Sequence, residues 1–206
     1  MNINSSLFSG LILAGGEGRR MHGQDKGLIN VLKKPLIEYA IECLTPLVDD
    51  LSISCNRNKS RYSDYKIDCL SDYQTPGRNE FLGPMAGIVS GLKHARHDWL
   101  MIMPCDTPLM NTEMMRQLVD AIRENESRGL QAVVFSYQGL QPLHGIYHKS
   151  LLPLLEQSLA ENNNSVQKLI RTTNTIEVIH AKGVVHHFIN ANDEKELNTI
   201  EQLITP

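Results

Sequence analysis

The sequence lacks several features that would place a protein in a broad class at once. No apolar run approaches the roughly 20 residues that a membrane-spanning helix needs, and residues 1–6 have neither a basic start nor a long apolar middle. The formal net charge is −3 with acidic and basic residues interspersed, so no basic field favours nonspecific binding to nucleic acid. We therefore predict a cytoplasmic protein that binds neither membranes nor nucleic acid.

Sequence patterns for metal binding and disulfides are also missing. No C-x-x-C pair occurs, and each of the four cysteines lies in or beside an apolar segment: Cys43, Cys55, Cys69 and Cys105. We expect free, mostly buried thiols in a reducing compartment rather than a zinc site or disulfide bonds. The histidines on predicted strands show no metal-ligand spacing, so we assign none of them to catalysis.

Internal repeats, linkers and low-complexity segments are absent, and strand patterns alternate with helix patterns instead. We predict a single domain over residues 1–206 with a three-layer α/β/α, Rossmann-like sandwich and a mostly parallel sheet. An antiparallel hairpin over residues 131–147 is expected toward the far side of the sheet. The predicted strands are residues 8–13, 51–55, 67–70, 99–103, 131–137, 143–147, 176–180 and 184–189. The predicted helices begin near residues 35, 84, 112, 150, 165 and 194.

Local signals predict the helix ends and the connections. Thr112 is expected to cap its helix, residues 56–61 to form a polar connection, and residues 74–83 to form a long loop. Residues 193–196 have the spacing of a capping box. The last helix is predicted to bury Leu197, Ile200 and Leu203.

The strongest functional signal lies in residues 11–26. An apolar run stops at a glycine-rich loop, where backbone N–H groups can turn toward a ligand. Arg19, Arg20 and Lys26 add positive charge there. The stretch therefore predicts a site for a phosphate-bearing ligand.

Two familiar nucleotide motifs do not fit this loop. A P-loop would need Lys and Ser or Thr where the chain has Gln24 and Asp25. A dinucleotide fingerprint would need its final glycine where the chain has Met21. Hydride transfer and simple triphosphate hydrolysis both lose support.

Charged side chains of the loop are candidates for phosphate chemistry. The ammonium of Lys26 is a mobile point charge suited to phosphate oxygens. Arg20 could clamp phosphates with its planar fork or pack Met21; we assign it to phosphate and Arg19 to the surface. Asp25 could orient Lys26 or belong only to the local turn.

Asp106 follows an apolar strand directly. A carboxylate in this position points into the crevice at the carboxyl ends of the strands, where open α/β sheets bind ligands. There it could hold Mg²⁺ against phosphate oxygens. The alternative is a capping or turn role before Pro108.

The motif L-A-G-G-x-x-x-R-M at residues 13–21, together with P-C-D-T-P at residues 104–108, resembles the molybdenum cofactor guanylyltransferases. These enzymes belong to the nucleotidyltransferase superfamily, which also contains sugar-nucleotide pyrophosphorylases. The resemblance continues through G-P-M-A-G at residues 83–87 and N-A-N at residues 190–192. It implies Mg²⁺-dependent transfer of GMP from GTP to the terminal phosphate of molybdopterin or Mo-molybdopterin, with release of pyrophosphate.

The same resemblance implies roles for residues of the loop and of the metal site. Lys26 would bind the phosphates, and Asp106 would bind both nucleotide and metal. Backbone groups of the first loop would lie against the guanine nucleotide: Leu13, Ala14, Gly15 and, in the same loop, Gly16. A nucleotide-binding half is expected over about residues 1–110 and an acceptor-binding half over about residues 111–206.

Further positions take roles from the resemblance. Asp72 would accept hydrogen bonds from the base or ribose, although an aspartate at a strand end commonly forms a turn. Ser54 stands where the family often has asparagine, so the nucleotide role belongs to Ser54 or Asn56. Asn190 and Asn192 would contact the pterin, whose mixed edge suits amides, and the alternative for Asn192 is a helix cap. His22 and Asp193 replace the usual glycine and threonine.

Two other functions stay open at this point. One is a cytidylyltransferase acting on the same cofactor or on a sugar or alcohol phosphate, although such relatives typically carry L-A-A-G, with alanine in place of Gly15. The other is a noncatalytic nucleotide-binding protein, against which the presence of both Lys26 and Asp106 argues. Molybdoenzymes and upstream cofactor-biosynthesis proteins are implied as possible partners by the resemblance alone.

Overall fold

The computed structural model describes residues 8–16, 24–75, 82–179 and 185–205. A seven-stranded sheet runs through the molecule in the order β5-β4-β1-β6-β8-β7-β9. Its strands are β1 (Phe8–Leu13), β4 (Asp50–Ser54), β5 (Asp68–Leu70), β6 (Trp99–Pro104), β7 (Ala132–Ser136), β8 (Leu140–His148) and β9 (Thr175–Ile179). A small antiparallel pair, β2 (Asn30–Val31) and β3 (Lys34–Pro35), lies apart from it.

The sheet is mostly parallel, as the alternating pattern predicted. Strands β5, β4, β1 and β6 run parallel, and so do β7 and β9. Only β8 is antiparallel to its neighbours, because it returns from β7 through a hairpin and inserts beside β6. The predicted hairpin is confirmed, with β9 rather than the hairpin at the edge of the sheet.

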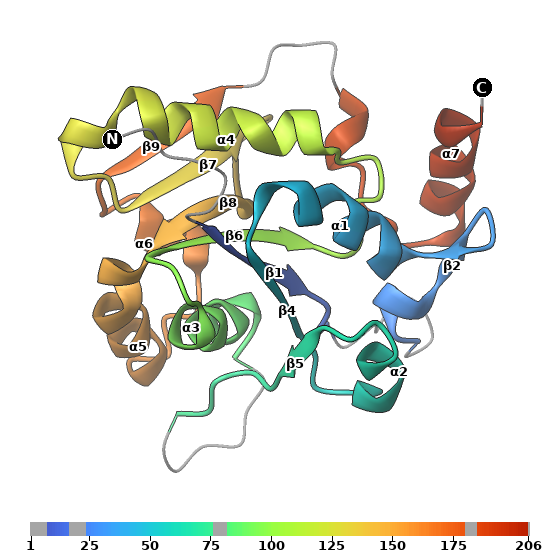
Figure 1. Cartoon of the computed structure of the whole chain (residues 1–206), viewed down its shortest axis with the longest axis horizontal. Coiled ribbons are helices and arrows are strands. Elements are labelled where there is room, and N and C mark those ends of the chain that lie inside the picture. The colour runs from blue at the N-terminus through green and yellow to red at the C-terminus, as the bar shows by residue number, and fades with distance from the viewer. Residues whose placement is uncertain (1–7, 17–23, 76–81, 180–184, 206) are drawn as a thin grey trace.

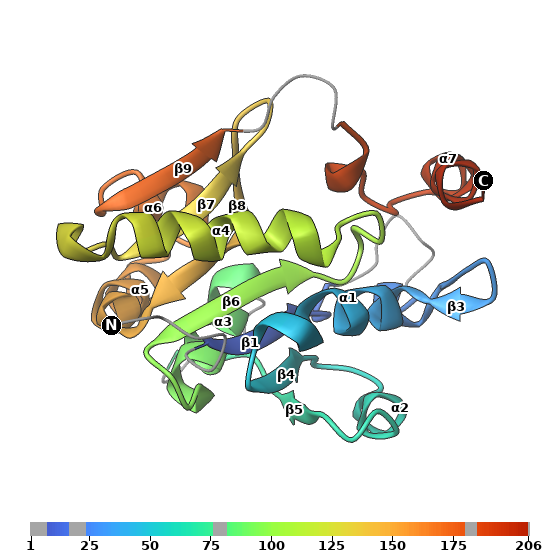
Figure 2. The ribbon, with the colours of Figure 1, turned by 45° about the horizontal axis from the view of Figure 1, so that its top comes forward.

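Helices cover both faces of the sheet and complete three layers (Figures 1 and 2). On one face α1 (Leu36–Leu44) and α4 (Thr112–Glu124) pack against it; on the other lie α3 (Pro84–His94), α5 (Leu152–Ala160) and α6 (Val166–Ile170). The buried apolar stripes of these helices fill the two cores, as the helical periodicity predicted. Helix α7 (Glu194–Ile204) stands to one side, near β2 (Figure 1).

Several local predictions were wrong. Residues 185–188 form a short 3-10 helix instead of a strand. The backbone N–H of Ile189 donates to His186, three residues earlier, and Phe188 packs against Phe135. Part of the polar connection after β4 is a helix, α2 (Lys59–Ser63), too short to show a periodic apolar signal.

Two helix ends also differ from the prediction. Asn111, not Thr112, caps α4: its side chain accepts the N–H of Met114, and the Thr112 hydroxyl donates to the carbonyl of Cys43. Asp193 caps α7 by accepting the N–H of Glu196, as the capping box predicted. Ile200 of α7 is buried and Leu197 is partly buried, as predicted, whereas Leu203 is 45% exposed because its neighbour Ile204 faces the apolar cluster in its place.

No helix among the described residues combines the length and the apolar character that crossing a membrane requires. Most of the predicted long loop over residues 74–83, and the predicted strand end at residue 180, lie outside the described residues. The four cysteines are free, and three of them are buried: Cys43, Cys55 and Cys105.

Candidate active site

The candidate site lies where three neighbouring parallel strands end. Leu13 at the end of β1 pairs with Ser54 of β4 on one side and with Pro104 of β6 on the other. Backbone bonds carry this pairing one residue further, from Ala14 N to the carbonyl of Ser54 and from Cys105 N to that of Leu13. The segments that follow these strands therefore meet at one edge of the sheet.

Lys26, Asp106 and Asn192 come together at this edge. The Lys26 ammonium lies 2.9 Å from Asp106 Oδ2 and 2.6 Å from Asn192 Oδ1, and donates to both. The side chains of Lys26 and Asp106 are 20% and 17% exposed. A backbone bond of 2.7 Å from Ala191 N to the Asp106 carbonyl joins the same two loops. The structure thus brings together two of the predicted catalytic residues and one predicted acceptor residue.

The second carboxylate oxygen of Asp106 has no hydrogen-bond partner among the described residues, although it is buried. Buried polar atoms are nearly always paired, so an orphaned carboxylate oxygen indicates a ligand. Oxygen is the donor that Mg²⁺ prefers, and Mg²⁺ usually binds one or two carboxylates together with substrate phosphates. No group of three or more His, Cys, Asp or Glu side chains gathers in the described part. These residues fit a divalent ion shared with a phosphate ligand, rather than one held by protein side chains alone.

Asp72 forms the centre of a second polar group at the same edge. Ser54 Oγ donates to its Oδ1 at 2.6 Å, and Asn56 Nδ2 donates to its Oδ2 at 2.7 Å. In return Asn56 Oδ1 accepts the N–H of Asp72 at 3.0 Å. Asp72 is therefore more than a turn former: two neighbouring residues hold its carboxylate in a fixed orientation.

Two glycines make room for this second group. A Cβ on Gly87 of α3 would lie 2.8 Å from Ser54 Oγ and 2.9 Å from Leu13 Cδ2. A Cβ on Gly15 would lie 3.3 Å from Asp72 Oδ2. A side chain at position 87 would force Ser54 or Leu13 to move, and one at position 15 would leave a tight contact with Asp72, which gives a physical reason for two residues of the sequence motifs.

The remaining predicted site residues differ in their surroundings. Gly16 lies next in the loop, and its carbonyl accepts a hydrogen bond from Arg57. Asn190 is exposed, and its amide donates to the carbonyl of Phe188 at 3.4 Å, so it does not join the Lys26 group. Asn192 binds Lys26 and leaves the capping of α7 to Asp193. Arg20 and His22 lie outside the described residues.

Asp25 neither bonds to Lys26 nor caps its turn with its side chain. Its carboxylate instead accepts hydrogen bonds from Tyr62 and Asn58, two residues that the sequence analysis did not select. Neither residue lies in an apolar pattern or a known motif that would have marked it. Only the fold brings them beside the glycine-rich loop.

His144 lies beneath the Asp106 loop, fully buried on β8. Its Nε2 is 2.9 Å from the hydroxyl of Thr107, and burial lowers the pKa of its imidazole to about 3. Burial likewise raises the pKa of the Cys105 thiol well above its ordinary value. Around neutral pH both groups are uncharged, so neither adds a charge beside Asp106 and Lys26.

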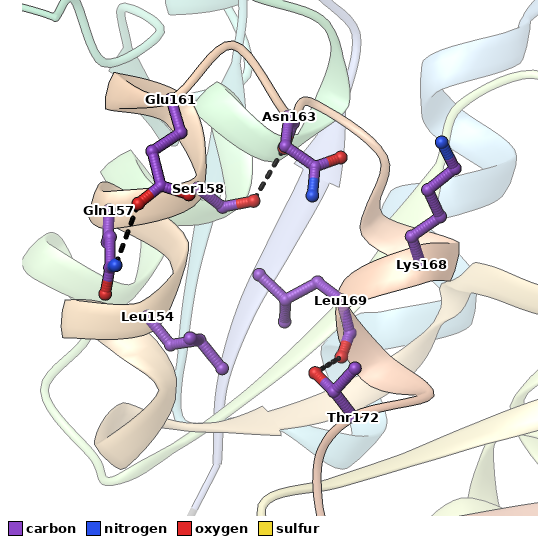
Figure 3. Close-up of a pocket in the computed structure, with 8 residues that line it drawn as sticks. All are labelled: Leu154, Gln157, Ser158, Glu161, Asn163, Lys168, Leu169 and Thr172. Carbon is purple, nitrogen blue, oxygen red and sulfur yellow. Dashed lines mark hydrogen bonds between the residues drawn. The ribbon is translucent and has the colours of Figure 1, made fainter.

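A separate pocket lies between α5 and α6, lined by side chains of both helices (Figure 3). Two of its polar side chains have partners within the pocket wall: Gln157 donates to the carboxylate of Glu161, and Ser158 donates to the backbone carbonyl of Asn163. None of the residues predicted for nucleotide or acceptor lines it. The pocket therefore has no part in the candidate site.

Comparison with known proteins gives relatives along nearly the whole chain. A protein of Pseudomonas putida GB-1 named molybdenum cofactor guanylyltransferase is 39% identical over 160 residues, which cover 78% of this chain and 80% of the relative. A Vibrio parahaemolyticus protein of the same name is 36% identical over 197 residues, 95% of either chain.

Solved structures share the fold. The molybdopterin-guanine dinucleotide biosynthesis protein A of Archaeoglobus fulgidus superimposes with a TM-score of 0.76 at 22% identity, covering 95% of this chain and 97% of that one. A cytidylyltransferase of Thermus thermophilus, which acts on 2-C-methyl-D-erythritol 4-phosphate by its name, reaches a TM-score of 0.68 at 13% identity, covering 95% and 97%. The fold alone therefore does not discriminate between guanine and cytosine.

Residues 10–178 match the family described as the MobA-like NTP transferase domain, and the curated relatives match both sides of the candidate site. The resemblance found in the sequence motifs is confirmed by this match. The chain belongs to the MobA-like NTP transferase family.

Proposed function

We propose that the protein transfers GMP from GTP to the terminal phosphate of molybdopterin, forming the guanine dinucleotide form of the molybdenum cofactor and releasing pyrophosphate. The observation that carries this proposal is the hydrogen bonding of the Asp106 carboxylate. One of its carboxylate oxygens pairs with Lys26, and the other is buried without a partner among the described residues, at the edge where open α/β sheets bind ligands. The names of the relatives supply the guanine nucleotide and the molybdenum cofactor.

The reaction needs no nucleophile from the protein. An anionic oxygen of the acceptor's terminal phosphate attacks the α-phosphorus of GTP, and the bond from that phosphorus to the β-phosphate oxygen breaks. Pyrophosphate leaves with the bonding electron pair. The protein has to align and neutralise clustered negative groups, which is the main part of catalysis in such transfers.

Lys26 is placed to perform part of this task. Its ammonium already lies between Asp106 and Asn192, so a phosphate that enters between these residues meets a positive charge. Arg20, from the same loop in the sequence, is proposed as a second phosphate ligand. We propose that Mg²⁺ is the divalent ion and that Asp106 binds it; bound there, it would neutralise charge on the phosphate oxygens.

The nucleoside is proposed to lie on the β1 and β4 side of the site. Backbone groups of the loop would contact it: Leu13, Ala14, Gly15 and Gly16. Asp72, held by Ser54 and Asn56, would accept hydrogen bonds from the base or ribose. A fixed carboxylate suits guanine, whose N1–H and N2–H₂ donate side by side, better than cytosine, which presents an acceptor next to its amino group.

The acceptor is proposed to lie on the Asn192 side, with Asn190 at its rim. This division gives a nucleotide half over about residues 1–110 and an acceptor half over about residues 111–206. Delivery or receipt of the cofactor by molybdoenzymes or by upstream biosynthesis proteins remains a prediction. A cytoplasmic location is also proposed, supported by the four free thiols.

The decisive experiment measures pyrophosphate release from GTP and molybdopterin with Mg²⁺, for the wild type and for Lys26→Ala. The variant should stay folded and lose at least 100-fold in turnover. A matched control is Lys149→Ala, which removes a lysine that donates to the carbonyl of Ala95 before the amino end of β6, at the opposite edge of the sheet. Near-normal turnover of Lys26→Ala would contradict the assignment.

Two further measurements separate the rival functions. Calorimetry with GTP and CTP tests the base, and tighter binding of CTP would favour a cytidylyltransferase. Nucleotide binding without pyrophosphate release, whichever acceptor is supplied, would favour a noncatalytic binding protein.

A further inference from the structure

The connection after β4 contacts more of the candidate site than its polar, featureless sequence suggested. Residues 56–62, which we call the 56–62 segment, run from the end of β4 into α2. Asn56 binds Asp72, Arg57 Nη2 donates to the carbonyl of Gly16 at 3.0 Å, and Asn58 Nδ2 donates to Asp25 Oδ2 at 3.0 Å. The segment thus touches the nucleoside side and both described ends of the glycine-rich loop.

Its firmest attachment is to Asp25. The Tyr62 hydroxyl donates to Asp25 Oδ1, so each carboxylate oxygen of Asp25 has a partner from the segment. The ring of Tyr62 is fully buried. Burial and the bond to Asp25 raise the pKa of this hydroxyl far above its ordinary value, so it stays a donor at every working pH.

The Tyr62 ring also packs against the turn that carries Lys26. A Cβ on Gly27 would lie 2.5 Å from the Tyr62 hydroxyl oxygen, so only glycine lets the ring approach. Asp25 and Lys26 begin a 3-10 turn, in which Leu28 N donates to the Asp25 carbonyl at 3.0 Å and Ile29 N to that of Lys26 at 3.1 Å. Fixing Asp25 and Gly27 therefore fixes the backbone of the residue between them.

We propose that Tyr62 and Asn58 are positioning residues, which hold Asp25 and Gly27 so that the Lys26 ammonium reaches Asp106 and Asn192. They act through Lys26 and touch no substrate. The proposal rests on the proposed function for its kinetic consequence, since Lys26 is the assigned phosphate ligand. A side chain that contacts the reacting phosphate can lose a large share of its effect on the transition state when it is displaced by about 1 Å.

The experiment compares two conservative variants of neighbouring tyrosines. Tyr62→Phe removes the bond to Asp25. Tyr65→Phe removes a similar tyrosine–carboxylate bond three residues later, the 3.0 Å contact with Glu38, in which neither Asp25 nor Lys26 takes part. Turnover, KM for GTP, thermal midpoint and hydrogen exchange of the peptide over residues 24–29 are measured for both.

We expect Tyr62→Phe to lower kcat about 10-fold with a less than 3-fold change in KM, and to speed exchange of the Leu28 and Ile29 amides about 10-fold. Tyr65→Phe should leave kcat and this exchange at wild-type values. A purely structural role predicts a fall in thermal midpoint for both variants without a change in kcat, and that result would overturn the proposal.

A second variant tests the other contact without a tyrosine. Asn58 has a left-handed backbone with φ of 51°, so Asn58→Gly removes the amide and keeps the backbone unstrained. Lys66→Gly, at φ of 57°, is the matched control. We expect the first alone to accelerate exchange over residues 24–29 and to lower kcat, about 3-fold each, and equal effects of the two would overturn the role of Asn58.

The hydrogen-exchange measurement does not depend on the acceptor substrate. If the wild type releases no pyrophosphate, the proposed function fails, while the difference in exchange between Tyr62→Phe and Tyr65→Phe still decides the positioning role. Unchanged exchange in Tyr62→Phe would overturn that role even in an active enzyme.

Discussion

The polar groups that lie at the two ends of β1 differ in how completely they are hydrogen-bonded. At the amino end, Ser9 is buried; its hydroxyl donates to Asp50 Oδ1 at 2.8 Å and accepts the N–H groups of Arg96 and His97 at 3.0 and 3.2 Å. At the carboxyl end, the buried Oδ1 of Asp106 has no partner in the described part of the chain. The hydrogen-bond network at the amino end of β1 is therefore complete, and we call it the closed end. The network at the carboxyl end has an acceptor without a partner among the described residues, and we call it the open end.

This difference distinguishes polar groups that stabilise the fold from polar groups that bind a ligand. Hydrogen bonds that pair every buried polar atom lower the free energy of the fold and leave no buried group that lacks a partner without a ligand. A buried acceptor left unpaired costs stability, roughly 1–3 kcal/mol or more, and persists where function uses it. Substitutions at the two ends should consequently affect different measurements.

The largest effect is expected at the open end, for Asp106→Asn. The amide keeps the shape of the side chain but removes the negative charge that faces Lys26 and the proposed metal ion. We expect turnover to fall about 1,000-fold, equivalent to about 4 kcal/mol of transition-state stabilisation. Pyrophosphate release measures the loss, and denaturant unfolding should show a change below about 1 kcal/mol. Turnover within threefold of the wild type would remove Asp106 from the site.

A smaller loss is expected for Gly87→Ala, because the new Cβ would displace Ser54 and Leu13. We expect kcat/KM for GTP to fall about 30-fold, or about 2 kcal/mol. Gly91→Ala is the matched control: one turn along α3, its Cβ would meet Leu11 at 2.6 Å in the core. It should lower stability without changing KM, and an equal change in KM would show that Gly87 has no special relation to the nucleotide.

At the closed end, Ser9→Ala should change stability and not catalysis. It removes the partner of two backbone N–H groups and of Asp50, and we expect the free energy of unfolding to fall by about 2 kcal/mol. Ser52→Ala removes only one bond, of 3.2 Å to the carbonyl of Gly10, and should cost less. Urea unfolding and steady-state kinetics test both, and a tenfold loss of kcat/KM in Ser9→Ala would break the division between the two ends.

The smallest effect at neutral pH is expected for His144→Phe. The native pKa of about 3 lies below the ordinary 6.5, so below pH 6.5 the unfolded chain binds a proton that the native protein does not. Wild-type stability should therefore fall as pH drops from 6.5 toward 3, by up to about 1.4 kcal/mol per pH unit from this group. The variant should lose this part of the slope, which thermal midpoints between pH 7.5 and 5 would reveal. His148→Phe, at a partly exposed histidine of the same strand, should keep it.

The sequence predicted the open end better than the closed one. An apolar run followed by glycine or by a carboxylate is a local signal, and it located β1, the loop after it and Asp106. Lys26 followed from its place beside the glycines. Ser9 gave no such signal, because the N–H groups that it accepts belong to residues almost 90 positions away.

The contacts of Asp25 show the same limit within the site. The sequence predicted that Asp25 would either orient Lys26 or belong only to the local turn, and both of these interactions are close along the chain. The actual partners, Tyr62 and Asn58, lie 37 and 33 positions away. Periodicity describes which face of an element is buried and does not say which distant element covers it. The 3-10 helix at residues 185–188 escaped prediction for a related reason, since its apolar residue Phe188 packs on the distant Phe135 rather than taking a place in the sheet.

The bond between Lys26 and Asn192 spans 166 positions of the chain. During synthesis, β1, β4 and β6 can pair long before Asn192 leaves the ribosome, whereas Lys26 gains its second partner only when the loop before α7 docks. Contacts of such separation form late because closing a long loop costs chain entropy. The enzyme should therefore acquire its nucleotide-binding strands early and its complete phosphate geometry last, and a fragment that ends before residue 190 should regain that geometry when a peptide of residues 190–205, which carries Asn192 and α7, is added back.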